Sequence, residues 1–93
     1  MNHEPLRRNV VVANPNGLHM RPSAAFVELA KSFQSAVTVT HNGTCVDGKN
    51  SVLDLMLLMA MPGSELMLEA RGPDAPQMLD ALSELLSRVP TEA

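Results

Sequence analysis

The sequence NVVVANPNGLHMRPS, residues 9–23, decides how the fold begins. Residues 9–13 are mostly β-branched and apolar, which is typical of a strand buried in a sheet. Residues 14–17 then break the strand with asparagine, proline and glycine, which favour turns. Pro22 predicts a helix that begins at about Met20, because the amide proton that proline lacks would have no intrahelical acceptor in the first turn. The stretch therefore predicts a strand that leads through a tight loop into a helix.

The chain after this helix predicts a hairpin, then a helix, a strand and a last helix. Residues 36–40 alternate with period two, residues 41–43 supply turn chemistry, and residues 44–46 return as a second strand. Residues 51–61 are apolar almost throughout, too short to cross a bilayer and too long for an ordinary strand, so we expect a short helix there. Residues 65–70 predict a strand. The last helix has one apolar stripe, made of Met78, Leu79, Leu82, Leu85, Leu86 and Val89.

This element order, βαββαβα, predicts an α+β fold. We expect an open-faced sandwich, in which a four-stranded antiparallel sheet carries three helices on one face. The length of 93 residues fits a single domain over residues 1–93. The polar N-terminal residues 1–9 lack the apolar core of a secretory signal, and no stretch is long and apolar enough for a bilayer. We therefore expect a cytoplasmic protein without membrane insertion.

Charge and aromatic content argue against a nucleic-acid partner. The formal net charge is -3, and the few basic residues are scattered. Phosphate backbones require a denser positive field than this. Phe26 and Phe33 are the only aromatic residues, and both fall in the first predicted helix, so no stacking platform for bases is expected.

Cys45, His3 and His41 give no indication of a metal site, and we expect no cofactor. Cys45 is the only cysteine, which excludes an internal disulfide, and its neighbours predict a buried, inert thiol. His3 lies near the N-terminus and His41 at the hairpin tip, without metal-like spacing to each other or to His19. We expect His3 and His41 to be solvated surface residues.

The residues suited to chemistry concentrate where the first loop meets the first helix. Backbone amides at a helix start lack intrahelical partners, and the helix dipole adds about half a positive charge, so an anion is favoured there. His19 lies at this point, and a neutral imidazole is a nucleophile that can accept a phosphoryl group. Arg21 can neutralise the charge that develops during transfer. The predicted loop and phosphate cradle consists of Asn16, Gly17, Pro22 and Ser23.

The residues Gly17-Leu18-His19, followed by Arg21-Pro22, resemble the active-site signature of the HPr family, the histidine-containing phosphocarriers of the bacterial phosphotransferase system. The resemblance extends from about Arg8 to Leu86. It implies that His19 accepts a phosphoryl group from enzyme I, which phosphoenolpyruvate charges, and passes it to an enzyme IIA domain in sugar uptake. Arg21 would be its electrostatic partner. Such a protein is a carrier rather than an independent catalyst, since it supplies the nucleophile and enzyme I the positioned donor.

The resemblance also implies a regulatory site at Ser51, where many relatives carry a serine that an HPr kinase/phosphorylase modifies. A phosphate at a helix start is favoured by the dipole. Ser51 is also a good N-cap for the predicted helix, and the sequence leaves both roles open.

A docking surface is expected on the second helix, because a helix that is apolar almost throughout cannot bury every side on one sheet. In the family, the residues that match Val52, Leu53 and Met56 form an apolar patch that contacts enzyme I and the acceptor proteins. Met20, where relatives usually have a small residue, would widen this patch or partly cover His19. Tighter packing or self-association is the alternative. Glu28 and Asp54, acidic where many relatives are neutral or basic, predict weaker docking to an acidic enzyme I surface.

Two other functions remain open. One is a regulatory HPr-like protein that signals through phosphorylation of His19 or Ser51 without a sugar permease. The other is an unrelated small α/β sandwich, such as a metal chaperone or an RNA-binding module. The sequence lacks the paired cysteines of a metal chaperone, and it lacks the strand aromatics of an RNA-binding module.

Overall fold

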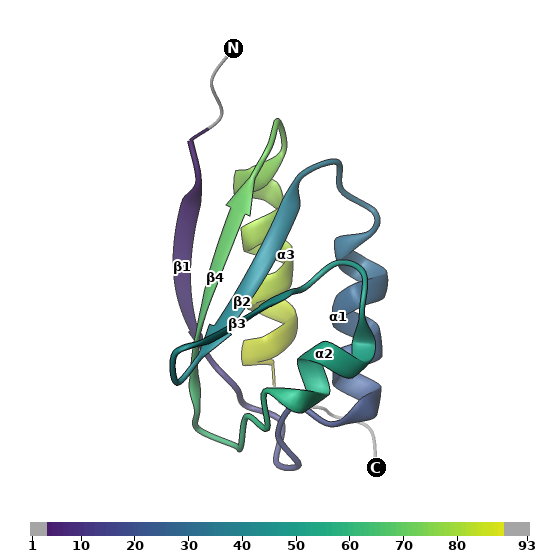
Figure 1. Cartoon of the computed structure of the whole chain (residues 1–93), viewed down its shortest axis with the longest axis vertical. Helices are drawn as coiled ribbons and strands as arrows, with labels where there is room; N and C mark the ends of the chain where they lie inside the picture. Colours follow the sequence, from purple (N-terminus) through teal and green to yellow (C-terminus); the bar gives the residue numbers. More distant parts are fainter. Residues whose placement is uncertain (1–3, 89–93) are drawn as a thin grey trace.

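The computed structural model describes residues 4–88, in which three helices cover a four-stranded sheet (Figure 1). The predicted order βαββαβα is confirmed. The elements are β1 (Leu6–Val11), α1 (Met20–Ala30), β2 (Ala36–His41), β3 (Thr44–Asp47), α2 (Val52–Leu57), β4 (Glu65–Arg71) and α3 (Ala75–Ser87).

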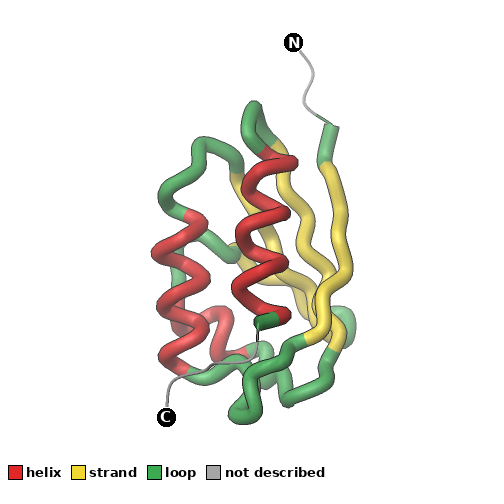
Figure 2. The backbone as a smooth tube through the Cα atoms, turned by 180° about the vertical axis from the view of Figure 1, so that it is seen from behind, coloured by secondary structure: helices red, strands yellow, loops and turns green. Residues whose placement is uncertain are grey.

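The sheet has the strand order β1-β4-β2-β3, and each neighbouring pair is antiparallel. Strand β4 therefore lies inside the sheet, where it pairs with β1 on one side and with β2 on the other. Seen from behind, the helices lie together on one face of the sheet (Figure 2). The predicted open-faced sandwich is confirmed.

The core lies between the sheet and the helices. On β2 and β4 the residues alternate with period two, so that Val37, Val39, Leu66 and Leu68 are buried while their chain neighbours are more exposed. Burial of each such side chain contributes about 1.5–3 kcal/mol. The helices complete the core with a set of fully or almost fully buried side chains: Phe26 and Val27 from α1, Leu55 from α2, and Met78, Leu79 and Leu82 from α3.

The first strand and the second helix differ from the predicted bounds. Strand β1 starts earlier than residue 9 because its pairing with β4 extends to Leu6, opposite Ala70. The helix expected over residues 51–61 is shorter, because Met59 has a φ of 56° in the left-handed region that ends helices. Among residues 4–88, no helix is long and apolar enough to cross a membrane. Val89, expected in the last apolar stripe, lies outside the described residues.

Cys45 is exposed, so the expectation of a buried thiol is wrong. Its cross-strand partner is Thr40, whereas the next residue, Val46, pairs with the buried Val39. Since successive side chains point to opposite faces of a sheet, Val46 faces the helices and Cys45 the open face. The sequence around Cys45 is apolar enough for either register, and a shift of one residue exchanges the two faces.

The predicted hairpin is confirmed at its turn. Asn42 and Gly43 both have positive φ values, 50° and 82°, as a two-residue type I′ turn requires. The expectation that His41 is a solvated surface residue is wrong. His41 is half-buried, and its Nδ1 lies 3.0 Å from the carbonyl oxygen of Leu58. His3 lies outside the described residues.

Asp74, just before α3, joins that helix to the loop between α1 and β2. Its carboxylate accepts hydrogen bonds from the backbone amides of Gln34 and Ser35, both at 2.9 Å, and from the Ser35 hydroxyl at 2.5 Å. The Asp74 amide donates back to the Ser35 hydroxyl at 3.1 Å. The hydrogen bond from the Ser35 side chain, followed by that from the Gln34 amide, holds the pKa of Asp74 below its usual value.

We expect Asp74→Asn to destabilise the protein at neutral pH, because an amide cannot accept all the bonds that the carboxylate accepts. A depressed folded-state pKa stabilises the fold above the unfolded-state value of 3.8, and the gain is lost as the pH falls through 3.8 toward the folded-state pKa. We measure the free energy of unfolding of both proteins in urea, at neutral pH and at pH about 3. The difference between wild type and Asp74→Asn should be smaller in acid. Glu28→Gln, at an exposed position on α1, is the control. A stability difference that does not depend on pH would contradict the stabilising role of the Asp74 carboxylate.

Candidate functional site

His19 is the N-cap residue of α1. Its backbone is extended, with φ -86° and ψ -166°, and its carbonyl accepts the amide of Ser23 at 3.0 Å as the first turn begins. The imidazole makes no capping hydrogen bond, and the residue is half-buried. The ring therefore stands at the start of the helix without being used to close it.

The first turn of α1 offers amide donors. No acceptor within residues 4–88 bonds to the amides of Met20 and Arg21, and Pro22, the third helical residue, has no amide proton. Free amides and the helix dipole together give this end about half a positive charge. A phosphoryl group placed on the neighbouring imidazole would lie close to that charge.

Arg21 lies in the same turn, two residues after His19, and is exposed. Within the described part of the chain, the two ion pairs lie elsewhere, between Arg7 and Glu69 and between Arg8 and Asp80. The guanidinium of Arg21 therefore has no carboxylate partner among these residues. It is available to an anion at the helix start.

The loop before His19 is held by the backbone. Asn14 accepts the amides of Asn16 and Gly17, each at 2.9 Å, through its side chain and its carbonyl respectively. Gly17 has a φ of 71°, which favours glycine, and a β-carbon there would lie 2.4 Å from the carbonyl oxygen of Ala60. The amide of Leu18 donates to that same oxygen at 2.9 Å. The loop is therefore packed directly against the segment that follows α2.

Ser23 and Pro22 contribute to the loop in different ways. Ser23 is fully buried, and its hydroxyl donates to the carbonyl of Leu18 at 3.2 Å. Its side chain thus fastens the loop to the helix and does not face solvent. Pro22 is half-buried and fixes the backbone of the first turn.

Large apolar side chains are exposed on α2, after it and at the start of α1. Figure 1 shows α2 beside the first turns of α1. Of the residues predicted for docking, Met20 and Leu53 are 64% and 63% exposed, whereas Val52 and Met56 are half-buried. Three more exposed residues were not predicted. We call the exposed set the apolar patch: Met20, Leu53, Leu57, Met59 and Met61.

The early end of α2 explains the additional members of the patch. A helix of six residues buries only Leu55, and the chain beyond it buries Leu58 and Ala60 while Met59 and Met61 face outward. The sequence offers one sign of these additional exposed residues: the apolar run is longer than one buried helix face requires. Which residues of the run are buried and which are exposed depends on the turn at Met59. There a methionine adopts a conformation that is usually adopted by glycine.

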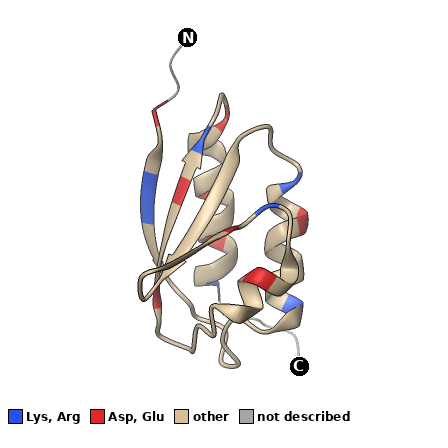
Figure 3. Ribbon diagram, viewed as in Figure 1, with Lys and Arg blue, Asp and Glu red and all other residues tan. Residues whose placement is uncertain are grey.

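Charge around this region is mixed. Arg21 lies in the first turn of α1 and Asp54 in the first turn of α2, and Figure 3 shows basic colour near the start of α1 and acidic colour on α2. Glu28 lies farther along α1 and is exposed. The surface around His19 therefore combines the exposed apolar patch with the cation of Arg21, which has no carboxylate partner among the described residues.

Ser51 is the N-cap of α2, as predicted. Its side-chain oxygen accepts the amide of Asp54 at 3.1 Å, and the residue is half-buried. A capping bond of this kind contributes about 1 kcal/mol.

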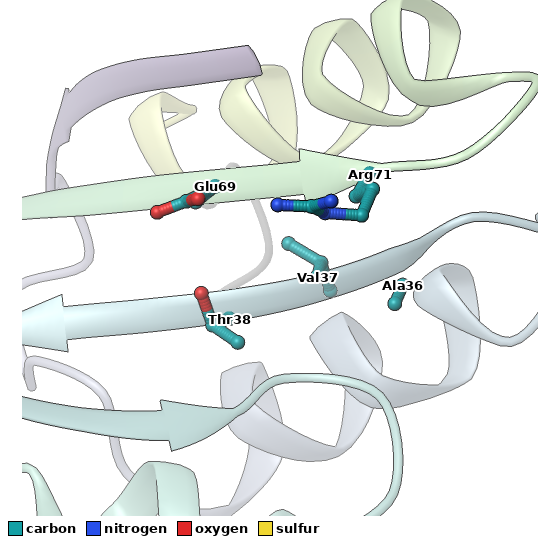
Figure 4. Close-up of a pocket in the computed structure, with 5 residues that line it drawn as sticks. All are labelled: Ala36, Val37, Thr38, Glu69 and Arg71. Carbon is teal, nitrogen blue, oxygen red and sulfur yellow. The ribbon is translucent and has the colours of Figure 1, made fainter. Parts of the chain in front are cut away.

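A shallow groove on the sheet lies away from His19. It has a volume of about 350 Å³ and is lined by Ala36, Val37, Thr38, Glu69 and Arg71 (Figure 4). These residues come from the beginning of β2 and the end of β4. His19 lies near the opposite end of β2, because the neighbouring Leu18 bonds to Ala60 and the last residue of β2 bonds to Leu58. The groove does not belong to the candidate site.

Comparisons with known proteins agree on one family. The family model for the phosphorylation site of the PTS HPr component matches residues 6–88. The phosphocarrier protein HPr of Cupriavidus necator is 42% identical over 82 residues, which cover 88% of this chain and 91% of that protein. HPr of Neisseria meningitidis serogroup A is 38% identical with the same coverage. A crystal structure of HPr from Bacillus anthracis superposes with a TM-score of 0.84 at 32% identity, covering 88% of this chain and 96% of that one.

Two glycines allow a test of the contact between the loop and Ala60. Gly17 and Gly43 both have positive φ, but a β-carbon at Gly43 would meet nothing within 4 Å. Gly43→Ala should therefore cost only backbone strain, about 1 kcal/mol. Gly17→Ala should cost about 1–3 kcal/mol more, because the Ala60 carbonyl must move. Urea unfolding measures both, and equal losses would refute the close packing.

Proposed function

The chain belongs to the PTS HPr family and is a phosphocarrier of the phosphotransferase system, and from this premise we propose that His19 is the residue that carries the phosphoryl group. The observation that supports the proposal most strongly is the position of His19. Its imidazole stands at the start of α1, without a capping bond of its own, next to amides that no other described residue uses.

Transfer to His19 proceeds by nucleophilic attack. A neutral ring nitrogen donates its lone pair to phosphorus, and the bond between phosphorus and the phosphorylated enzyme I breaks at the same centre. We assign the attack to Nδ1, the ring nitrogen nearer the backbone. The new phosphoryl group has about two negative charges, which the helix start and Arg21 stabilise. The same steps in reverse pass the group to an acceptor.

The partners are components of the phosphotransferase system, such as enzyme I and enzyme IIA. We propose that they dock on the apolar patch, where Met20 and Leu53 flank the helix start. Methionine suits a surface that meets several partners, because its flexible side chain can repack. We also propose that the protein works in the cytoplasm. The relatives described above are named as phosphocarriers, which favours the carrier role over a purely regulatory one.

Labelling from phosphoenolpyruvate and the cognate enzyme I tests the carrier. We expect one acid-labile phosphate on the wild-type protein and none on His19→Ala. Arg21→Ala should slow transfer by about 100-fold, because it removes a charge that opposes the developing negative charge. Arg71→Ala, which removes an exposed arginine from the far end of β4, is the matched control and should transfer at the wild-type rate. A wild-type rate for Arg21→Ala would remove it from the proposed role, and labelled His19→Ala would disprove the site.

We further propose that Ser51 is a regulatory phosphorylation site for an HPr kinase/phosphorylase. Its place at the start of α2 supports the proposal, because a helix start stabilises an added phosphate. The new charge would lie next to Leu53 of the apolar patch and would oppose apolar docking.

Incubation with the cognate kinase and ATP should place an acid-stable phosphate on the wild-type protein and on His19→Ala. Ser51→Asn is the matched variant, because asparagine keeps a capping oxygen but cannot be phosphorylated. It should remain unlabelled while its stability stays within a few tenths of a kcal/mol of wild type. If the wild-type protein acquires no acid-stable phosphate, Ser51 is only a helix cap.

A further inference from the structure

His41 makes a contact that joins two separate parts of the fold. It is the last residue of β2, and its Nδ1 lies 3.0 Å from the carbonyl oxygen of Leu58, the C-cap residue of α2. A carbonyl oxygen only accepts, so Nδ1 must carry a hydrogen and donate it. The ring therefore fastens the end of the second helix to the end of the hairpin strand.

The segment held by this bond is strained. Met59 follows Leu58 directly and has a φ of 56°. Methionine rarely adopts this left-handed conformation, which is commoner for glycine and asparagine. Leu58 and Ala60 on either side are buried, with 6% and 4% of their surfaces exposed. A strained conformation persists only where the surroundings hold it, and the His41 bond is one of the contacts that do so.

The same segment supports the loop that ends in His19. Ala60 lies two residues after Leu58, and its carbonyl accepts the amide of Leu18 at 2.9 Å. The carbonyl of Leu18 in turn accepts the hydroxyl of Ser23. Two hydrogen bonds, connected by the backbone of residues 58–60, thus link His41 to Leu18, the residue next to His19.

We propose that His41 is a positioning residue for phosphoryl transfer, acting through Leu58 and Ala60 on the loop that presents His19. The inference rests on the proposed role of His19 as the carrier. Without the donor of His41, the Leu58 carbonyl loses its partner and residues 58–60 relax. The support for Leu18 then weakens, and Met59 and Met61 of the apolar patch shift with it.

Amide hydrogen exchange tests the structural half of the proposal without any partner protein. In His41→Leu, which has similar bulk but no donor, the Leu18 amide should exchange about 10-fold faster, while the Leu68 amide in the sheet interior keeps its protection. His41→Asn should restore the protection of Leu18, because its amide nitrogen can take the place of Nδ1. Thr44→Val, opposite His41 in the hairpin, is the control and should leave Leu18 unchanged.

Transfer kinetics with phosphorylated enzyme I test the functional half. The kcat/KM of His41→Leu should fall about 10-fold, while His41→Asn and Thr44→Val stay near wild type. Unchanged Leu18 exchange or unchanged kcat/KM in His41→Leu would overturn the positioning role, as would equal losses in His41→Leu and His41→Asn. Failure of wild-type His19 to accept phosphate would disprove the proposed function instead, and the exchange experiment would still report on the contact.

Discussion

The hydrogen bond from the Leu18 amide to the Ala60 carbonyl is the contact on which the geometry of the site depends. It brings the loop after β1 against the segment after α2, so closely that only glycine fits at position 17. Further hydrogen bonds hold this loop: a turn within residues 14–17, the bond from the Ser23 hydroxyl to Leu18, and the bond from the Ala13 amide to the Leu86 carbonyl at 3.0 Å. Because the bond lies one residue before His19, it sets where α1 begins and where the imidazole stands.

That arrangement separates two tasks that a carrier must combine. The helix start favours negative charge, and Arg21 adds a cation in the same turn. The apolar patch has little charge and favours contact with other proteins, but it does not select the anion. Since the two regions are joined through the bond between Leu18 and Ala60, a partner that docks on Met59 or Met61 lies close to His19.

The sequence predicts the element order and the placement of His19 because both depend on local signals: periodicity, turn residues and a proline near a helix start. It does not predict features that depend on pairing between distant residues. Cys45 faces outward because of the register between β2 and β3, and His41 is half-buried because α2 ends nearby. The end of α2 is itself hidden, since Met59 gives no sign that it adopts a left-handed conformation. For the same reason the sequence does not predict which apolar side chains after Met59 are buried and which are exposed.

The two edge strands of the sheet, β1 and β3, are poor templates for pairing with another chain. Strand β3 has four residues, so it presents few unpaired backbone groups to another chain. Strand β1, the opposite edge, carries Arg7 and Arg8, whose side chains remain 63% and 40% exposed despite their ion pairs and hinder the approach of a second strand. Both edges therefore hinder edge-to-edge pairing with the sheet of a second copy, which suits a carrier that meets its donor and its acceptors in turn.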